Sequence, residues 1–348
     1  MVLRWRKKRV LFIIAVCSIA WICLRFQSLY CSERKGMEIL RVLCSEYQKN
    51  RTSGNMCEII CKDDIHLTCN GFHGGKSVVL KAKTGSNIFI IKSSSSSLHD
   101  VEAWNPDFDQ YDLLATLEAK LRIDFPDSST ERIFDYFHAY DLTSPVIRND
   151  LWNLANDHEF VLSLMLETLE LFPRILGHCG TLFAVEYVDT LNNFKYNNSS
   201  IVIAKKIAEF LIHVRDDTEK LYLCDVKPSH FGESVNGIWK YVDLDAVLSY
   251  DILARNIKLR SSCTTDLDCS YFDCVFLCNK NTKQCGKSMV TSNVQIICKN
   301  IFIGGFWLGR GLLEMHKSTL IRDTLLQCIN DSAFTEEDLI NALSAIEG

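Results

Sequence analysis

The sequence predicts an α+β fold, with strands concentrated in the first half of the chain and helices in the second. Two β-branched runs, residues 77–83 and 88–92, flank the turn sequence Thr84-Gly85-Ser86-Asn87, a pattern typical of a β-hairpin. Apolar residues at helical spacing follow in residues 157–171 and 200–214. The chain has 348 residues, of which 47% are hydrophobic, so it can bury one large core or two modest ones.

A basic segment and an apolar run open the chain. Five Lys or Arg residues lie within residues 1–9, and residues 10–24 are uncharged and almost wholly apolar. Because positive charge stays on the cytosolic side, residues 1–9 are predicted to be cytosolic, residues 10–26 a transmembrane signal anchor, and the bulk of the chain lumenal, as in a single-pass type II protein. A cleaved signal peptide is the alternative, since the run is short for a span and contains the small residues Ser18 and Ala20.

Cysteine usage also favours an oxidising compartment. Fourteen of the sixteen cysteines lie beyond the apolar run, which predicts disulfides. Residues 27–70 hold five of them and are interpreted as a disulfide-stapled cap; a zinc site is the weaker alternative, because no paired C-x-x-C occurs. Residues 263–285 hold another five, an odd number, so we expect pairing mostly inside this segment with one partner elsewhere. Four sequons indicate a glycoprotein, and a net charge of −5 offers no basic field for nucleic acid.

The remaining elements follow from local patterns. The mixed segment 98–156 is expected to hold a helix near residues 112–123, and the segment 294–313 a buried helix rather than a second span. Thr335-Glu336-Glu337-Asp338 is a favourable helix start. Further strands are predicted at residues 175–176, 181–188, 221–223 and 239–242.

The segment from Leu221 to Val247 carries the chemistry. It contains Cys224-Asp225-Val226-Lys227-Pro228-Ser229-His230-Phe231 and then Tyr241-Val242-Asp243-Leu244-Asp245. This resembles the H-R-D-x-K-x-x-N catalytic loop of protein kinases followed by their D-F-G metal motif, with a spacing of 18 residues between the two aspartates. Asp225 and Lys227 are therefore the predicted catalytic residues, and the predicted metal ligands are Asp243, His230 and Asp245.

Residues upstream fit a nucleotide site in the expected order. Lys92 ends the second strand of the hairpin, where a kinase places its phosphate-binding lysine, and Glu159 opens the following helix as that lysine's partner. Glu167 is a competing partner that lies close to the next strand. Glu186 begins the segment that matches the kinase hinge. Lys92, Glu159 and Glu186 are thus the predicted cofactor-binding residues, for ATP with Mg²⁺ or Mn²⁺.

These motifs, the anchor and the segment CTTDLDCSYFDCVFLCNKNTKQC together resemble the divergent protein kinase domain 1 family. Its members are cysteine-rich type II proteins of the endoplasmic reticulum membrane. The resemblance implies a bilobal protein-kinase-like fold. Its N-lobe would span residues 71–190 with an insertion at 98–156, and its C-lobe residues 191–348 with a cysteine-rich insert at 263–285.

Departures from the kinase pattern leave two functional hypotheses open. Cys224 stands where Arg normally precedes the catalytic aspartate, His230 replaces the metal-binding Asn, and residues 71–76 only loosely resemble a glycine-rich phosphate loop. The first hypothesis is a lumenal phosphotransferase that uses ATP to modify a secretory-pathway protein or glycan. The alternative is a catalytically inactive pseudokinase that acts as an interaction module of the endoplasmic reticulum.

Overall fold

The computed structural model describes residues 33–62, 64–69, 78–93, 110–124, 130–191, 200–217, 221–258, 262–305, 309–314 and 318–347. It forms two compact units. Unit 1 comprises the described parts of 1–108, 143–157 and 176–185; unit 2 comprises those of 109–142, 158–175 and 186–348. Residues 1–9, 10–26 and 71–76 lie outside the described residues. Among the described residues, no helix has both the length and the apolar character needed to cross a membrane.

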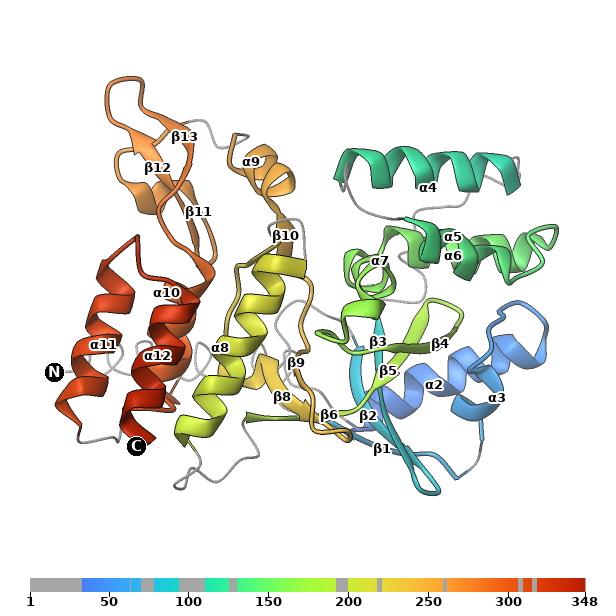
Figure 1. The fold of residues 1–348 in the computed structure, drawn as a ribbon. Coiled ribbons are helices and arrows are strands. Elements are labelled where there is room, and N and C mark those ends of the chain that lie inside the picture. The colour runs from blue at the N-terminus through green and yellow to red at the C-terminus, as the bar shows by residue number, and fades with distance from the viewer. Residues whose placement is uncertain are drawn as a thin grey trace, which may run out of the picture. The chain divides into compact units, whose positions relative to one another are not determined.

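Unit 1 is built on a five-stranded sheet (Figure 1), and the predicted hairpin is confirmed. Thr84 of β2 lies opposite Asn87 of β3, and Gly85 adopts a φ of 57° in the turn, a backbone conformation that glycine adopts readily. The strands predicted around residues 175–188 are also present. In sheet order the strands are β1 (His66–Cys69), β2 (Val78–Thr84), β3 (Asn87–Ser93), β5 (Leu182–Glu186) and β4 (Ile175–Cys179).

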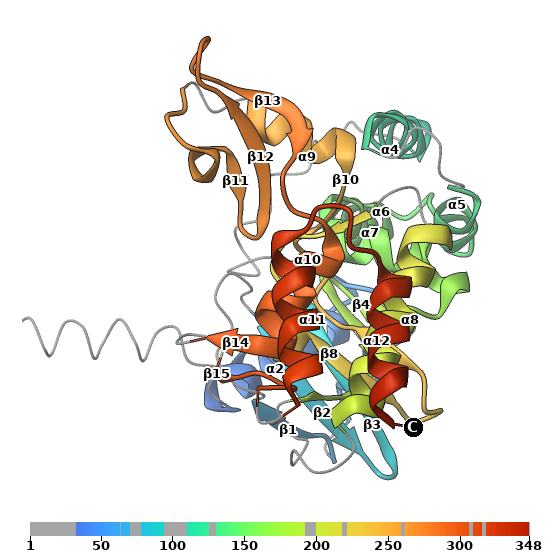
Figure 2. The same cartoon turned by 60° about the vertical axis from the view of Figure 1, so that its left-hand side comes forward.

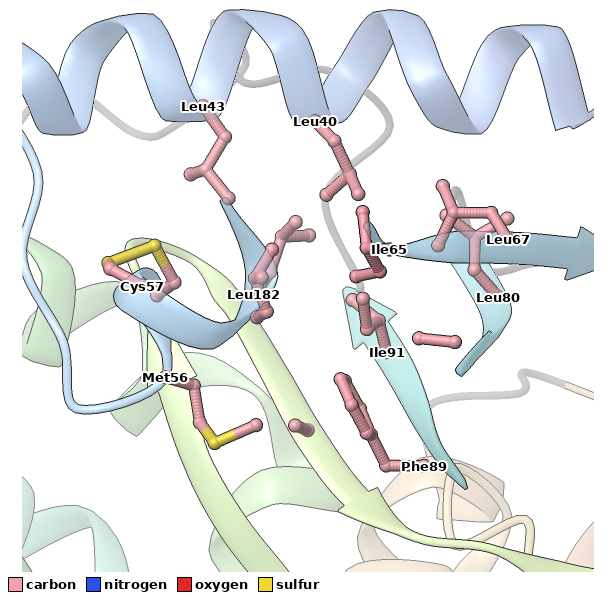
Figure 3. Packing of buried hydrophobic residues seen from close by; sticks show 14 residues of the cluster. Leu40, Leu43, Met56, Cys57, Ile65, Leu67, Leu80, Phe89, Ile91 and Leu182 are labelled. Carbon is pink, nitrogen blue, oxygen red and sulfur yellow. A yellow bond between two sulfur atoms is a disulfide. The ribbon is translucent and has the colours of Figure 1, made fainter. Parts of the chain in front are cut away.

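Helices α2 (Glu33–Gln48) and α3 (Cys57–Ile60) pack on this sheet through a shared apolar core. Figure 3 shows Leu40 and Leu43 of α2 pointing toward Leu182 and Ile91 of the strands. Disulfides Cys44–Cys61 and Cys57–Cys179 reinforce the same core. The disulfides expected in the first cysteine-rich stretch are present in its described part, and the zinc alternative is excluded for Cys44, Cys57 and Cys61 because their sulfurs are bonded to other cysteines.

A buried carboxylate joins α6 (Pro145–Asn156) to the loop before α3. Oδ2 of Asp150 accepts hydrogen bonds from the Ser53 amide at 2.8 Å, the Ser53 hydroxyl at 3.0 Å and the Thr52 hydroxyl at 3.1 Å. Burial is the main influence on Asp150 and raises the pKa of its carboxyl to about 6. The carboxyl that binds Thr52 and Ser53 of this loop is therefore one whose ionised form is disfavoured by burial.

Unit 2 contains most of the helices, and several of them come from the first half of the chain. The expectation of a β-rich first half was therefore wrong, because the segment 98–156 is mainly helical where it is described. The helices are α4 (Gln110–Asp124), α5 (Glu131–His138), α7 (His158–Met165), α8 (Ser200–Asp217), α9 (Tyr250–Lys258), α10 (Asn293–Ile297), α11 (Thr319–Asn330) and α12 (Glu336–Glu347).

Helix α12 packs along α8, as Figure 2 shows. Arg215 of α8 donates to Glu336 and Glu337, and Thr335 and Asp338 cap α12 reciprocally, which confirms the predicted helix start. The single buried helix predicted for 294–313 is wrong beyond its first part. After α10 the chain forms a π-helix at Cys298–Ile303 and then the short strands β14 (Gly304–Gly305) and β15 (Gly309–Arg310), because glycine disfavours helix continuation.

Besides the β14–β15 pair, the described part of unit 2 contains three small sheets. Strand β7 (Leu221–Leu223) pairs with β10 (Val247–Ser249), and β8 (Phe231–Ser234) lies between β6 (Val188–Thr190) and β9 (Trp239–Tyr241). The cysteine-rich insert forms β11 (Ser270–Tyr271), β12 (Cys274–Asn279) and β13 (Gln284–Met289). Its disulfides are Cys263–Cys278, Cys269–Cys285 and Cys224–Cys274, so the expected outside partner is Cys224.

Candidate functional site

The loop that carries Asp225 begins where β7 ends. The Cys224 amide donates to the Ala246 carbonyl at 3.0 Å, which continues the β7–β10 pairing into the loop. A 3-10 turn at Pro228–His230 follows, with proline at its first position, where a missing N–H costs least. The turn leads directly into β8. The loop is therefore anchored at both ends by strands, which fixes where Asp225 and Lys227 lie.

Asp225 and Lys227 form an ion pair at this loop. The Lys227 ammonium lies 2.7 Å from Oδ2 of Asp225, and the two side chains are 45% and 23% exposed. An exposed pair of this kind adds little to folding stability. Its placement instead leaves a carboxylate and an ammonium open to a reactant.

His230 and Tyr241 both bind the backbone carbonyl of Asp225. The Tyr241 hydroxyl and Nδ1 of His230 each lie 2.8 Å from that oxygen. Burial raises the pKa of Tyr241 well above its ordinary value, and the negative charges of Asp243 and Asp225 add to this shift, so the hydroxyl remains a donor. A carbonyl oxygen can only accept, so Nδ1 of His230 must carry a proton and Nε2 is left as the acceptor of the neutral ring.

Nε2 of His230 faces Asp243. It lies 3.2 Å from Oδ2 of that carboxylate, a distance that would suit an ion pair if the imidazole were charged. Burial, however, is the largest influence on the pKa of His230 and lowers it, outweighing the opposing effect of the Asp243 charge. At neutral pH the neutral imidazole nitrogen and the carboxylate oxygen therefore face each other as two acceptors. A cation bound by both atoms would relieve this opposition.

The acidic side chains around Asp243 supply further ligand atoms. Asp225, His230 and Asp243 offer atoms within 4.8 Å of one another, and so do Glu159, Asp243 and Asp245. Glu159 lies in the first turn of α7 and is 1% exposed. Carboxylate oxygens suit Mg²⁺ or Mn²⁺, and the imidazole nitrogen shifts the set toward Mn²⁺. The residues present thus fit a divalent cation.

Glu159 and Glu167, the two candidate partners for the phosphate-binding lysine, have different neighbours in the structure. Glu159 joins the acidic group, whereas Glu167 pairs with Arg132 at 2.8 Å. Lys92 lies on β3 in unit 1 and is 6% exposed; its convergence with the acidic group of unit 2 stays a prediction.

Glu186 lies at the end of β5, where its carboxylate is engaged within the protein. Oε1 pairs with the buried ammonium of Lys240 and accepts from the Arg174 amide at 2.9 Å. A side-chain contact from Glu186 to a nucleotide stays a prediction.

Three residues of the site were missed by sequence reasoning: Tyr241, Asp273 and Asn300. Tyr241 lies two residues before Asp243, and its proximity to the motif was the available signal. Asp273 accepts a hydrogen bond from the Val226 amide at 2.8 Å, and it precedes Cys274, the cysteine that pairs outside the insert. The odd number of cysteines in the insert was the available signal toward this region. Asn300 donates to the Val226 carbonyl at 3.2 Å, and no sequence pattern indicates that contact.

Comparison with known proteins identifies two family models that match the chain. The model described as the protein-kinase domain of FAM69 matches residues 151–331, and the model for the N-terminal cysteine-rich endoplasmic reticulum segment of FAM69 matches residues 3–115. Among solved structures, the complex of Rv3197 with erythromycin from Mycobacterium tuberculosis is similar at 15% identity with a TM-score of 0.25. The match covers 52% of this chain and 46% of that one, and nothing about this protein is inferred from it.

Proposed function

The chain belongs to the FAM69 family of divergent protein-kinase-like proteins, and from this premise we propose that it transfers a phosphoryl group from ATP to a secretory-pathway protein or glycan. The observation that carries the proposal is the proximity of Asp225 and His230, on the strand-anchored loop between β7 and β8, to Asp243, which follows β9, with Lys227 paired to Asp225. Phosphoryl transfer requires positioned acids and a cation more than it requires covalent chemistry by the protein.

Each residue has a role that follows from its position. Asp225 would accept the proton of the attacking hydroxyl, because its carboxylate is partly exposed. Lys227 would offset the negative charge on the transferring phosphoryl group. Asp243 and His230, with Asp245 or Glu159, would hold Mn²⁺ or Mg²⁺, and that ion, when bound, neutralises charge on the nucleotide phosphates.

We further propose that the chain is anchored in the endoplasmic reticulum membrane by residues 10–26, with its bulk in the lumen. The support is the charge asymmetry of the N-terminus together with the described disulfides, which persist in oxidising compartments. Protease protection of the bulk of the chain in intact microsomes, lost on detergent addition, is the expected result. Digestion in intact microsomes would contradict this topology.

Two measurements on the full chain test the phosphotransferase proposal. ATP with Mn²⁺ at a hundredfold excess over Kd should stabilise the protein by about 2.7 kcal/mol, which a thermal-shift titration detects. Radiolabel from γ-labelled ATP should reach an acceptor fraction from the secretory pathway. Asp243→Ala should abolish both signals, whereas Asp251→Ala, at an exposed acid of α9, should leave them unchanged. Transfer that survives Asp243→Ala would overturn the assignment.

The pseudokinase alternative is favoured by one observation, the replacement of the usual Arg and Asn by Cys224 and His230. It shares the fold and the nucleotide site but lacks transfer. Stabilisation by ATP and Mn²⁺ without transfer to any fraction would select it. Absence of both signals from the correctly disulfide-bonded protein would instead favour an interaction module with no nucleotide role.

A further inference from the structure

The cysteine-rich insert contacts the Asp225 loop through three links over two neighbouring residues. Cys274 forms the disulfide with Cys224, and both cysteines are fully buried. The Asp273 amide donates to the Cys224 carbonyl at 2.6 Å, and the Val226 amide donates to Oδ2 of Asp273 at 2.8 Å. Figure 1 shows the insert strands β11 to β13 beside α9 in the same unit.

These links fix the two peptide planes on either side of the Asp225 Cα atom. The Cys224 carbonyl belongs to the plane before Asp225, and the Val226 amide belongs to the plane after it. Because peptide units are planar, holding both planes restrains the φ and ψ angles that connect them. One residue, Asp273, therefore restrains the backbone angles from which the Asp225 side chain projects.

Asp273 is itself held in place by the insert. Its carbonyl accepts from the Thr291 hydroxyl at 3.1 Å, and that hydroxyl accepts from the Val275 amide at 3.0 Å. Phe272, the residue before it, adopts a φ of 49°, an uncommon angle for a residue other than glycine that persists where surrounding contacts impose it. The insert thus presents Asp273 to the loop as part of a fixed turn.

We propose that Asp273, with the Cys224–Cys274 disulfide, is the positioning device of the catalytic loop, and that it makes the cysteine-rich insert a functional part of this site. The proposal rests on the proposed function, because it assigns Asp273 a role through Asp225. Asp273 is a positioning residue, because its carboxylate accepts from a backbone amide of the loop, that of Val226. Cys224 stands where protein kinases usually have Arg, and its disulfide to Cys274 of the insert restrains the loop covalently.

The test compares three variants of the full chain. Asp273→Ala removes the acceptor of the Val226 amide, whereas Asp273→Asn keeps an oxygen in its place. Asp266→Ala is the matched control. Asp266 also accepts a hydrogen bond from a backbone amide, that of Cys278 at 2.7 Å, but both partners of this bond lie within the insert. We expect Asp273→Ala to lower kcat roughly 10- to 100-fold with little change in KM for ATP. Asp273→Asn should recover most of the kcat that Asp273→Ala loses, and Asp266→Ala should retain the wild-type kcat.

Hydrogen exchange provides a readout that needs no activity. In Asp273→Ala, amides of residues 221–231 should exchange faster than in wild type while those of β12 and β13 stay protected, and Asp273→Asn should restore the protection. Unchanged exchange at residues 221–231 in Asp273→Ala would overturn the proposal. So would equal loss of kcat in Asp273→Ala and Asp266→Ala. If the wild type transfers no phosphate, only the proposed function fails, and the exchange data still decide whether Asp273 positions the loop.

Discussion

The two cysteine-rich regions share a sequence signature but differ in what their disulfides join. In unit 1, Cys57 and Cys179 are buried among the apolar side chains of the sheet and helix α2. In unit 2, the outward disulfide of the insert ends on Cys224, next to Asp225. A high density of cysteines therefore corresponds to a disulfide-bonded apolar core in unit 1 and to the disulfide-bonded Asp225 loop in unit 2. The partner cysteine, and not the spacing inside the cluster, tells the two apart.

The largest expected effect is the loss of stability when the disulfide in the core of unit 1 is removed. Cys57→Ser with Cys179→Ser removes a link across a sequence separation of 122, which the chain-entropy model values at about 5 kcal/mol of unfolding free energy. The paired change Cys263→Ser with Cys278→Ser opens a separation of only 15 and should cost about 3 kcal/mol. Denaturant unfolding followed by hydrogen exchange in each unit measures both losses. A larger loss for the shorter link would contradict this ranking.

A smaller effect concerns pH and the core of unit 1. The folded pKa of Asp150, about 6, lies above its ordinary value of 3.8, so the ionised form is disfavoured in the folded state. The protonated carboxyl of Asp150 therefore contributes stability that is fully present below about pH 4 and is lost as the pH rises through about 6. Over this range the free energy of unfolding should fall by roughly 2 to 3 kcal/mol. Urea midpoints of unit 1 measured from pH 4 to 7 should show this slope in wild type. Asp150→Asn should remove it, and Glu58→Gln, at an exposed position, should keep it.

The smallest effect tests the chemistry of the acidic group. His230→Asn replaces an imidazole nitrogen with an amide oxygen, which should shift the ratio of Mn²⁺ to Mg²⁺ affinity by roughly tenfold toward Mg²⁺. Metal titrations followed by thermal shift measure the ratio without any phosphate acceptor. The same change at His213, exposed on α8, is the matched control. An unaltered ratio in His230→Asn would remove this imidazole from the set of metal ligands.

Local sequence pattern predicted the strands around the candidate site, whereas the roles assigned to its residues from motif spacing stay predictions. The turn between β2 and β3 and the strands that precede Asp225 and Asp243 depend on residues close in the sequence, as do the roles predicted for these two aspartates. Asp273 and Asn300 could not be predicted in the same way, because their contacts to Val226 span 47 and 74 positions. Such contacts depend on the path of the folded chain. The helix predicted for 294–313 failed for a local reason, since glycines end it early.

The link between Cys224 and Cys274 also orders events during biosynthesis. Its two cysteines are 50 positions apart, and chains are made from the N-terminus at about 5–20 residues per second, so the Asp225 loop emerges seconds before the insert that holds it. Oxidation must then follow translation of the insert. On the proposed function, a nascent chain would carry all its catalytic side chains and still be immature. Full activity would begin only after an oxidising compartment had closed that bond, which would confine it to chains whose insert has been made and oxidised.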